Sequence, residues 1–236
     1  IVLLQEVPWT REHGQIFQRL AQQGSFNFAY LRANGNYALN DFEEGSVILS
    51  RYPLQNFSFT ELRPPASFFD NRIVLHATVL APQGTIDLFV THLTNGKISA
   101  NAGQVESLID FVQDEAAYPA IVAGDFNATE ESPQIKRLSN LWLDSFRLAY
   151  PDDPGNTCCA TDPVNSSPTE LKSRIDYLFL VPKVAKSLKL IDVQRVFAEP
   201  FDVDDGRLWL SDHSGLLTTI IILSLIHISE PTRLHC

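Results

Sequence analysis

Residues 120–127 have the sequence Ala-Ile-Val-Ala-Gly-Asp-Phe-Asn, in which a short apolar run leads into a polar ending. Such a run predicts a buried strand. Asp125 and Asn127 follow this run, so their side chains are expected at the rim of a sheet, held rigidly by the strand. An acid at a strand end is commonly only a turn former or a helix cap. The stretch alone therefore leaves a structural and a functional interpretation open.

Acids and histidines occupy the same kind of position elsewhere in the chain. Glu6, His92, Asp176 and the pair Asp212-His213 are each expected at or near the C-terminal end of an apolar strand, or just past it. Several strand ends that converge form a cluster of oxygen ligands, which a hard cation such as Mg²⁺ requires. We therefore expect all of these side chains at one rim.

The spacing of apolar residues predicts many strands and few helices. Strands follow one another in hairpin-like succession, and helices are expected over residues 10–23, 99–115 and 132–140. The polar stretches 33–44 and 150–170 are expected to be loops. This order predicts two packed sheets covered by helices within a single domain.

The composition is that of a globular, acidic protein. The chain has 236 residues, of which 44% are hydrophobic, and a net charge of −10. This charge argues against a general nucleic-acid binder, because phosphate contacts come mainly from Lys and Arg. A local basic groove, or a cation held by carboxylates, still permits a phosphate substrate. No run of about 20 apolar residues predicts a transmembrane segment.

The three cysteines indicate neither a disulfide framework nor a zinc site. Cys158 and Cys159 are adjacent, and disulfide geometry is hard to meet between neighbours. The sequence has no Cys-x-x-Cys motif and no Cys/His cluster, so the pair is expected to pack in a loop or cap it. The sequence does not decide between a cytoplasmic and a secreted protein.

Six short motifs follow one another along the chain. In order they are Leu4-Gln5-Glu6-Val7, Ser50-Arg51-Tyr52-Pro53, Thr91-His92-Leu93, Gly124-Asp125-Phe126-Asn127, Arg174-Ile175-Asp176-Tyr177 and Ser211-Asp212-His213. Their order and spacing resemble the endonuclease/exonuclease/phosphatase family, which includes deoxyribonuclease-I-like nucleases, abasic-site endonucleases, neutral sphingomyelinases and inositol-polyphosphate phosphatases. The resemblance spans residues 1–222. It implies an α/β (α+β) fold, a four-layer α-β-β-α sandwich of two mixed, mostly antiparallel sheets.

The resemblance implies five catalytic residues. Asp125 resembles the aspartate that orients or activates the attacking water, and Asn127 the amide that hydrogen-bonds a phosphate oxygen or the water. His213 resembles the histidine that contacts the scissile phosphate, and Asp176 its carboxylate partner. His92 matches a further active-site histidine, which stabilises or protonates the leaving oxygen.

Four more residues are implied as ligands of a metal or of the substrate. Glu6 and Asp212 resemble the acids that bind Mg²⁺, with Mn²⁺ as an alternative cation. Arg72, at the start of a strand, and Asn95, just past the His92 motif, are candidates for contact with the substrate phosphate. The alternatives are a solvated cation for Arg72 and a turn residue for Asn95.

The resemblance also bears on both ends of the chain. Family members carry a strand and a helix ahead of the Glu6 motif, with an Asn beside the metal, and this sequence starts at Ile1 without them. Residues 223–236 resemble the translation of a transposase sequencing adapter, with a natural amphipathic tail as the alternative. The family domain is therefore expected over residues 1–222, N-terminally truncated, followed by a non-native tail.

The leading functional hypothesis is Mg²⁺-dependent hydrolysis of a phosphoester bond, chiefly a phosphodiester, by in-line attack of an activated water. One alternative is a DNA or RNA endonuclease or exonuclease, although the acidity leans away from tight DNA binding. Another is a non-catalytic family member that acts as a binding module. The expected partner is a lipid headgroup, an inositol phosphate or a nucleic acid, and the chain is expected to be a monomer.

Overall fold

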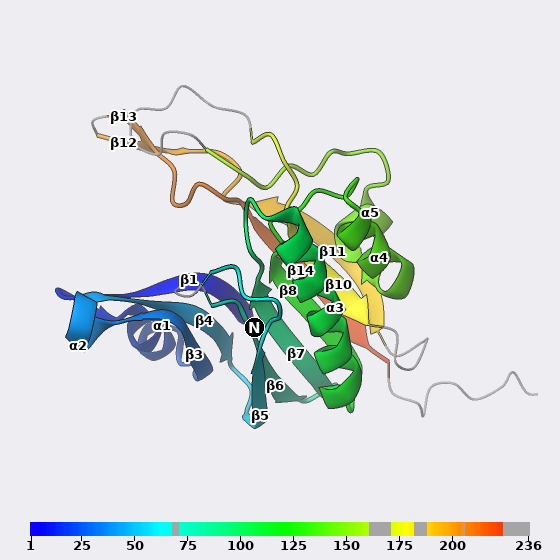
Figure 1. The fold of residues 1–236 in the computed structure, drawn as a ribbon, viewed down its shortest axis with the longest axis horizontal. Helices are drawn as coiled ribbons and strands as arrows, with labels where there is room; N and C mark the ends of the chain where they lie inside the picture. The colour runs from blue at the N-terminus through cyan, green and yellow to red at the C-terminus, as the bar shows by residue number, and fades with distance from the viewer. Residues whose placement is uncertain (68–70, 161–170, 182–187, 205, 224–236) are drawn as a thin grey trace, which may run out of the picture.

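The computed structural model describes residues 1–67, 71–160, 171–181, 188–204 and 206–223. Over these residues the chain forms a four-stranded and a six-stranded sheet and two strand pairs, with helices beside them (Figure 1). The α/β class with mixed sheets and few helices, predicted from the motifs, is confirmed. The α-β-β-α order of layers stays a prediction, and residues 224–236 of the expected tail lie outside the described residues.

The four-stranded sheet is made of β1 (Val2–Thr10), β2 (Gly14–Gln15), β3 (Asn27–Asn36) and β4 (Phe42–Ser50), beside α1 (Ile16–Gly24). It is antiparallel, in the order β2-β1-β4-β3. Val47 and Leu49 of β4 pack with Phe17 of α1 in one core, whereas Ile48 between them joins a different core. Successive residues of a strand point to opposite faces, so an unbroken apolar run buries both faces of this sheet.

The six-stranded sheet is made of β5 (Leu54–Glu61), β6 (Ile73–Ala81), β7 (Gly84–His92), β8 (Ala120–Asp125), β9 (Leu143–Asp144) and β10 (Asp176–Val181). Its helices are α3 (Ile98–Glu115), α4 (Pro133–Leu141) and α5 (Ser145–Ala149). In the order β5-β6-β7-β8-β10-β9, neighbours are antiparallel except β7 and β8. This parallel pair needs a crossover, which α3 provides. None of the described helices has the length and apolarity that a membrane crossing requires.

Two cores cover the faces of the six-stranded sheet. Leu108 of α3 and Ile135 of α4 pack against one face. On the other face, Leu75 and Ala123 meet Ile48 of the four-stranded sheet, so the two sheets pack against each other. The strand pair β11 (Leu188–Val196) and β14 (Gly215–Ile222) adds side chains to this second core, and a further pair is β12 (Phe201–Val203) with β13 (Gly206–Leu208).

Two predicted elements differ from the structure. Residues 33–44, expected as a loop, continue β3, form the short helix α2 (Tyr37–Asn40) and begin β4. The backbone ladder between β3 and β4 runs through these polar residues, so main-chain pairing overrides their composition. The helix expected from residue 10 begins only at Ile16, because β1 continues to Thr10 and β2 pairs back with it.

Candidate active site

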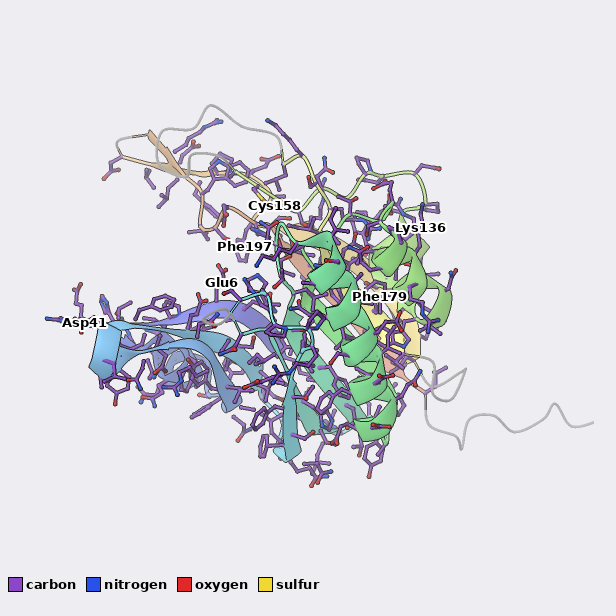
Figure 2. All side chains as sticks on the ribbon, in the orientation of Figure 1. Glu6, Asp41, Lys136, Cys158, Phe179 and Phe197 are labelled. Carbon is purple, nitrogen blue, oxygen red and sulfur yellow. A yellow bond between two sulfur atoms is a disulfide. The ribbon has the colours of Figure 1, made fainter. Side chains whose placement is uncertain are left out.

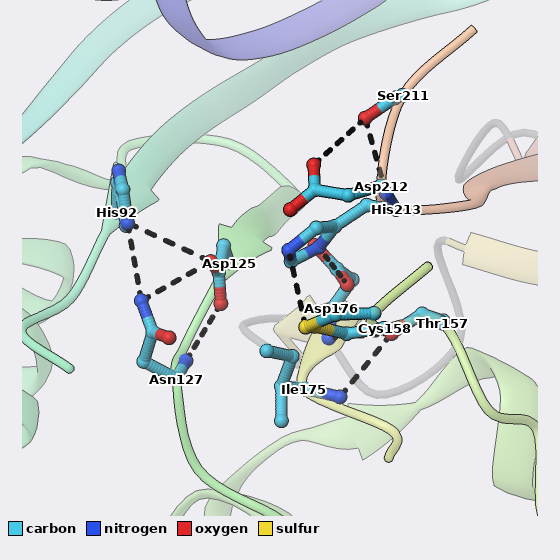
Figure 3. Close-up of a disulfide and its surroundings, with 11 residues drawn as sticks. His92, Asp125, Asn127, Thr157, Cys158, Ile175, Asp176, Ser211, Asp212 and His213 are labelled. Atoms are coloured by element: carbon cyan, nitrogen blue, oxygen red, sulfur yellow. Dashed lines mark hydrogen bonds and ion pairs between the residues drawn. A yellow bond between two sulfur atoms is a disulfide. The ribbon is translucent and has the colours of Figure 1, made fainter. Parts of the chain in front are cut away.

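Three candidate residues lie side by side on adjacent strands of the six-stranded sheet. His92, at the end of β7, is in register with Asp125 at the end of β8, and Asp125 is in register with Asp176 on β10. Residues in register on neighbouring strands point to the same face, so the side chains come together (Figure 3). His92 Nε2 lies 3.6 Å from Asp125 Oδ2. The three form a row at one edge of the sheet.

The direction of the strands differs from the prediction. Asp176 begins β10, and Asp212 and His213 lie in the loop before β14, so all three precede strands and do not end them. β10 runs antiparallel to β8. Its first residue therefore reaches the same edge of the sheet at which β8 ends.

Gly124 allows β8 to approach β7 closely just before Asp125. Its φ is +157°, and a Cβ atom at this position would lie 1.9 Å from the carbonyl oxygen of Thr91. Any other residue would therefore push the two strands apart. The glycine keeps His92 and Asp125 next to each other.

Asn127 links Asp125 to His92. Its backbone N–H donates to Asp125 Oδ1 at 2.7 Å, and its side-chain Nδ2 lies 3.1 Å from Asp125 Oδ2 and from His92 Nε2. The same nitrogen donates to the carbonyl of Leu93 at 2.9 Å, which fixes the orientation of the amide. The two hydrogens of this amide are shared among the groups that converge on it, so Asn127 ties Asp125 and His92 together.

Burial moves the pKa values of Asp125 and His92 in opposite directions. Burial and the negative charge of Asp176 raise the pKa of Asp125 to about 7, against the hydrogen bond from Asn127. Burial and the positive charge of Arg72 lower the pKa of His92 to about 3. At neutral pH His92 is therefore uncharged, and Asp125 exchanges its proton close to neutrality.

His213 completes the row from the loop before β14. Its Nδ1 lies 2.9 Å from Asp176 Oδ2, and its backbone N–H donates to Ser211 Oγ at 3.1 Å. Burial works against a charge on His213, but the hydrogen bond and charge of Asp176, together with Asp125, outweigh it and raise the pKa of His213 to about 9. The imidazole is therefore positively charged at neutral pH, with Nδ1 engaged by Asp176.

Glu6 reaches the site from the other sheet (Figure 2). It lies in a β-bulge of β1 with φ +51°, and its Oε1 is 3.8 Å from His92 Nδ1. Glu6, Glu44, Arg72 and His92 line one small cavity. Burial and the negative charge of Glu44 raise the pKa of Glu6, against the charge of Arg72. Only the pairing of β1 with β4 brings Glu44 close to Glu6.

The cysteine pair corrects the sequence prediction. Cys158 and Cys159 form a disulfide, and the cis peptide bond between them places their Cα atoms 3.1 Å apart. Cys159 Sγ lies 4.0 Å from His213 Nε2, at the border of the site. No feature of the sequence indicated that the pair lies next to His213.

The comparisons with known proteins identify the family. Residues 1–213 match the model of the endonuclease/exonuclease/phosphatase family. The chain belongs to this family. Its members are metal-dependent phosphoesterases, among them nucleases, phosphatases and deadenylases. No curated protein matches the chain.

Solved structures of the family share the fold. An endonuclease/exonuclease/phosphatase from Beutenbergia cavernae is 22% identical with a TM-score of 0.67, and the match covers 94% of this chain but only 62% of that one. A family protein from Leptotrichia buccalis is 17% identical, with a TM-score of 0.68 and coverage of 92% and 86%. A mannosyl-6-phosphatase from Bacteroides thetaiotaomicron is 14% identical, with a TM-score of 0.60 and coverage of 88% and 90%. At these identities the likeness concerns the fold alone.

The donor set fits the metal that this family uses. Asp125, Asp176 and His213 have ligand-type atoms within 4.8 Å of one another, but a charged His213 has Nδ1 engaged by Asp176 and is not free to bind a cation, so the carboxylates are the candidate ligands. The charges of Glu44 and Asp212 raise the pKa of Glu6, in addition to its burial, so several carboxylates repel one another across the site. A divalent cation relieves such repulsion, and carboxylate oxygens are the ligands that Mg²⁺ prefers.

The two candidates for phosphate contact differ in position. Arg72 lines the cavity of Glu6, and its positive charge acts on both Glu6 and His92. Asn95 is exposed in the loop after β7, and no described contact joins it to the other site residues. Only Arg72 therefore lies among the charged groups of the site.

Proposed function

We propose that this chain hydrolyses phosphoester bonds, chiefly phosphodiesters, in the presence of Mg²⁺. The observation that carries the proposal is the row at the sheet edge, where a charged His213 lies beside an Asp125 whose pKa is about 7. In-line attack of water on a phosphate needs a group that takes up a proton near neutrality and a fixed positive charge for the phosphoryl oxygens. A lipid headgroup, an inositol phosphate or a nucleic acid offers such a bond.

The proposed roles follow from the hydrogen bonds. Asp125 takes the proton of the attacking water, and the backbone N–H and amide of Asn127 hold its carboxylate in place. His213 has Nδ1 bound to Asp176, so its Nε2–H faces a non-bridging oxygen. His92 is uncharged, so it stabilises the leaving oxygen with an N–H and does not protonate it.

Glu6 and Asp212 are the proposed ligands of Mg²⁺, and Arg72 is the proposed contact to the phosphate. The mutual repulsion that raises the pKa of Glu6 supports this assignment. When bound, the cation polarises the phosphoryl oxygens and stabilises their negative charge. Asn95 remains a proposed substrate contact at the outer rim.

Metal removal tests the proposal. The purified chain is assayed with bis-p-nitrophenyl phosphate and p-nitrophenyl phosphate, in Mg²⁺ and in EDTA, alongside plasmid DNA, sphingomyelin and inositol phosphates. Hydrolysis of at least one substrate is expected in Mg²⁺, with loss in EDTA and recovery when Mg²⁺ or Mn²⁺ is returned. Activity that survives EDTA contradicts the metal mechanism, and no hydrolysis of any substrate favours a binding module.

The pH profile of an Asp176→Asn variant tests the pairing with His213. The charge on His213 is lost as pH rises through a pKa of about 9, and Asp176 holds that pKa up. Without the carboxylate the pKa falls, so the alkaline limb of kcat/KM against pH is expected to move down by about 1–3 pH units. The acidic limb moves the same way, because Asp176 also raises the pKa of Asp125.

The control is Asp114→Asn, an exposed acid on α3, whose profile is expected to match the unaltered chain. An alkaline limb that stays in place in Asp176→Asn would show that the charge of His213 is not needed for turnover.

A further inference from the structure

The chain contains two Asn-Gly pairs, Asn34-Gly35 and Asn95-Gly96. An asparagine before a glycine can lose its side-chain amide. The backbone nitrogen of the glycine bonds to the amide carbon of the asparagine, and the amide leaves as ammonia with the proton of that nitrogen. Water then opens the cyclic imide to aspartate or isoaspartate. Glycine favours this attack because it has no Cβ atom and its backbone adopts many conformations.

The pair Asn95-Gly96 lies in an open loop between β7 and α3. Both residues are exposed. A Cβ atom at Gly96 would meet nothing within 4 Å, so the backbone there is surrounded by open space. Within the described part of the chain, no hydrogen bond holds the side chain of Asn95 or the N–H of Gly96. The amide carbon and the nitrogen that attacks it are therefore free to meet.

The pair Asn34-Gly35 is held in the ladder between β3 and β4. Asn34 Oδ1 accepts the backbone N–H of Asn71 at 2.9 Å, and Asn34 Nδ2 donates to Glu44 Oε1 at 3.1 Å. Gly35, which carries the attacking nitrogen, is in register with Glu43 on β4. The side chain has to leave both partners and the strand has to open before the attack, and such local opening costs free energy. Asn34 is therefore protected where Asn95 is not.

We propose that Asn95 is a site of spontaneous deamidation, and that this modification changes the charge at the rim of the active site. Asn95 follows His92, the last residue of β7, by one short step of the loop. The product carries a carboxylate in place of a neutral amide, and isoaspartate also lengthens the main chain by one carbon just before α3. A phosphoester is negatively charged, so the new carboxylate repels it. The effect on activity rests on the proposed hydrolysis, whereas the modification itself does not.

Mass spectrometry of the aged chain tests the modification. Trypsin releases residues 73–97 as a peptide in which Asn95 is the only asparagine, and residues 33–51 as a peptide that contains Asn34. The folded chain is kept in mildly alkaline buffer and digested briefly at intervals. The fraction of each peptide with the mass gain of one deamidation is followed, and fragmentation locates the altered residue. The rate at Asn95 is expected to be at least about tenfold higher than the rate at Asn34.

The unfolded chain in guanidinium chloride is the matched control. There both Asn-Gly pairs are released, so their rates are expected to agree within about threefold. Asn95→Gln is expected to remove the mass gain from the peptide 73–97, because glutamine would have to form a larger ring. The proposal is overturned if Asn34 reacts as fast as Asn95 in the folded chain. It is also overturned if Asn95 reacts only in the unfolded chain.

Two variants test the effect on the active site. Asn95→Asp carries the charge of the product, whereas Asn95→Gln keeps a neutral amide. With bis-p-nitrophenyl phosphate in Mg²⁺, the KM of Asn95→Asp is expected to be at least about twofold above that of Asn95→Gln. The difference is expected to shrink at high salt, because salt screens exposed charges. Equal KM values in the two variants overturn the effect on the site.

The two measurements separate a failure of this proposal from a failure of the proposed hydrolysis. If the unaltered chain hydrolyses no substrate, the hydrolysis is refuted, and the mass spectra still decide whether Asn95 is modified. Binding of inorganic phosphate in Mg²⁺, measured by calorimetry in Asn95→Asp and Asn95→Gln, then replaces KM. Weaker binding in Asn95→Asp supports the effect of the charge, and equal binding overturns it.

Discussion

Asp125→Asn is expected to lower kcat by about 10²–10⁴-fold, the range in which a general base contributes to a proton transfer. The amide keeps the size of the side chain, and the N–H of Asn127 at 2.7 Å can still find an acceptor at Oδ1. The asparagine side chain at position 125 cannot take up a proton. The measurement is single-turnover and steady-state hydrolysis of bis-p-nitrophenyl phosphate in Mg²⁺.

The Asp125→Asn variant is expected to lose activity without losing stability. The folded pKa of Asp125 is about 7, above its ordinary value of 3.8, so the folded chain binds more protons than the unfolded chain between these pH values. The carboxylate therefore destabilises the fold increasingly as pH rises to about 7, and Asn removes that effect. The urea midpoint is expected to stay the same or rise at pH 8. Asp110→Asn, on the exposed side of α3, is the matched control. Nearly full activity in Asp125→Asn would remove Asp125 from the mechanism.

Arg174→Met is expected to lower the free energy of unfolding by about 3–5 kcal/mol, the cost of leaving a buried charge without its partner. Arg174 is 4% exposed, and its Nη1 donates to Asp144 Oδ2 at 2.6 Å. The guanidinium also bonds Glu130 and lies 4.5 Å from the ring centre of Tyr177. Methionine replaces the packing volume but leaves the buried carboxylate of Asp144 without its cation, with only the backbone N–H groups of Phe146 and Arg147 still donating to it. Urea unfolding followed by fluorescence measures the loss.

The control for this prediction is Arg137→Met. Arg137 pairs with Glu106 at 3.2 Å, but both side chains are about half exposed, so its loss is expected to cost no more than about 1 kcal/mol. A cost below about 1 kcal/mol in Arg174→Met as well would show that solvent reaches Asp144, and the pair would then be a surface interaction.

The sequence predicted the parts of the fold that depend on local pattern. The apolar run before Asp125 is the buried strand β8, and the stretches around residues 99–115 and 132–140 are helices close to the expected bounds. The order of the six motifs indicated the family, which the match over residues 1–213 confirms.

What the sequence could not predict depends on contacts between distant residues. The antiparallel pairing of β10 with β8 places Asp176, the first residue of its strand, beside Asp125 at the end of β8. Glu44 meets Glu6 only because β1 pairs with β4. The roles of the individual site residues stay predictions until the variants are measured.

Glu6 and His92 belong to different sheets, yet their side chains approach to 3.8 Å. No backbone hydrogen bond of a shared ladder sets this separation, so the apolar contacts between the sheets, such as Ile48 with Leu75, must do so. The apolar core between the two sheets thus sets the distance between Glu6 and His92. A conservative change deep between the sheets, far from any charged group, would widen or narrow the gap across which a cation and a phosphate have to fit. In the proposed mechanism, the catalytic rate therefore also depends on how the hydrophobic interior is packed.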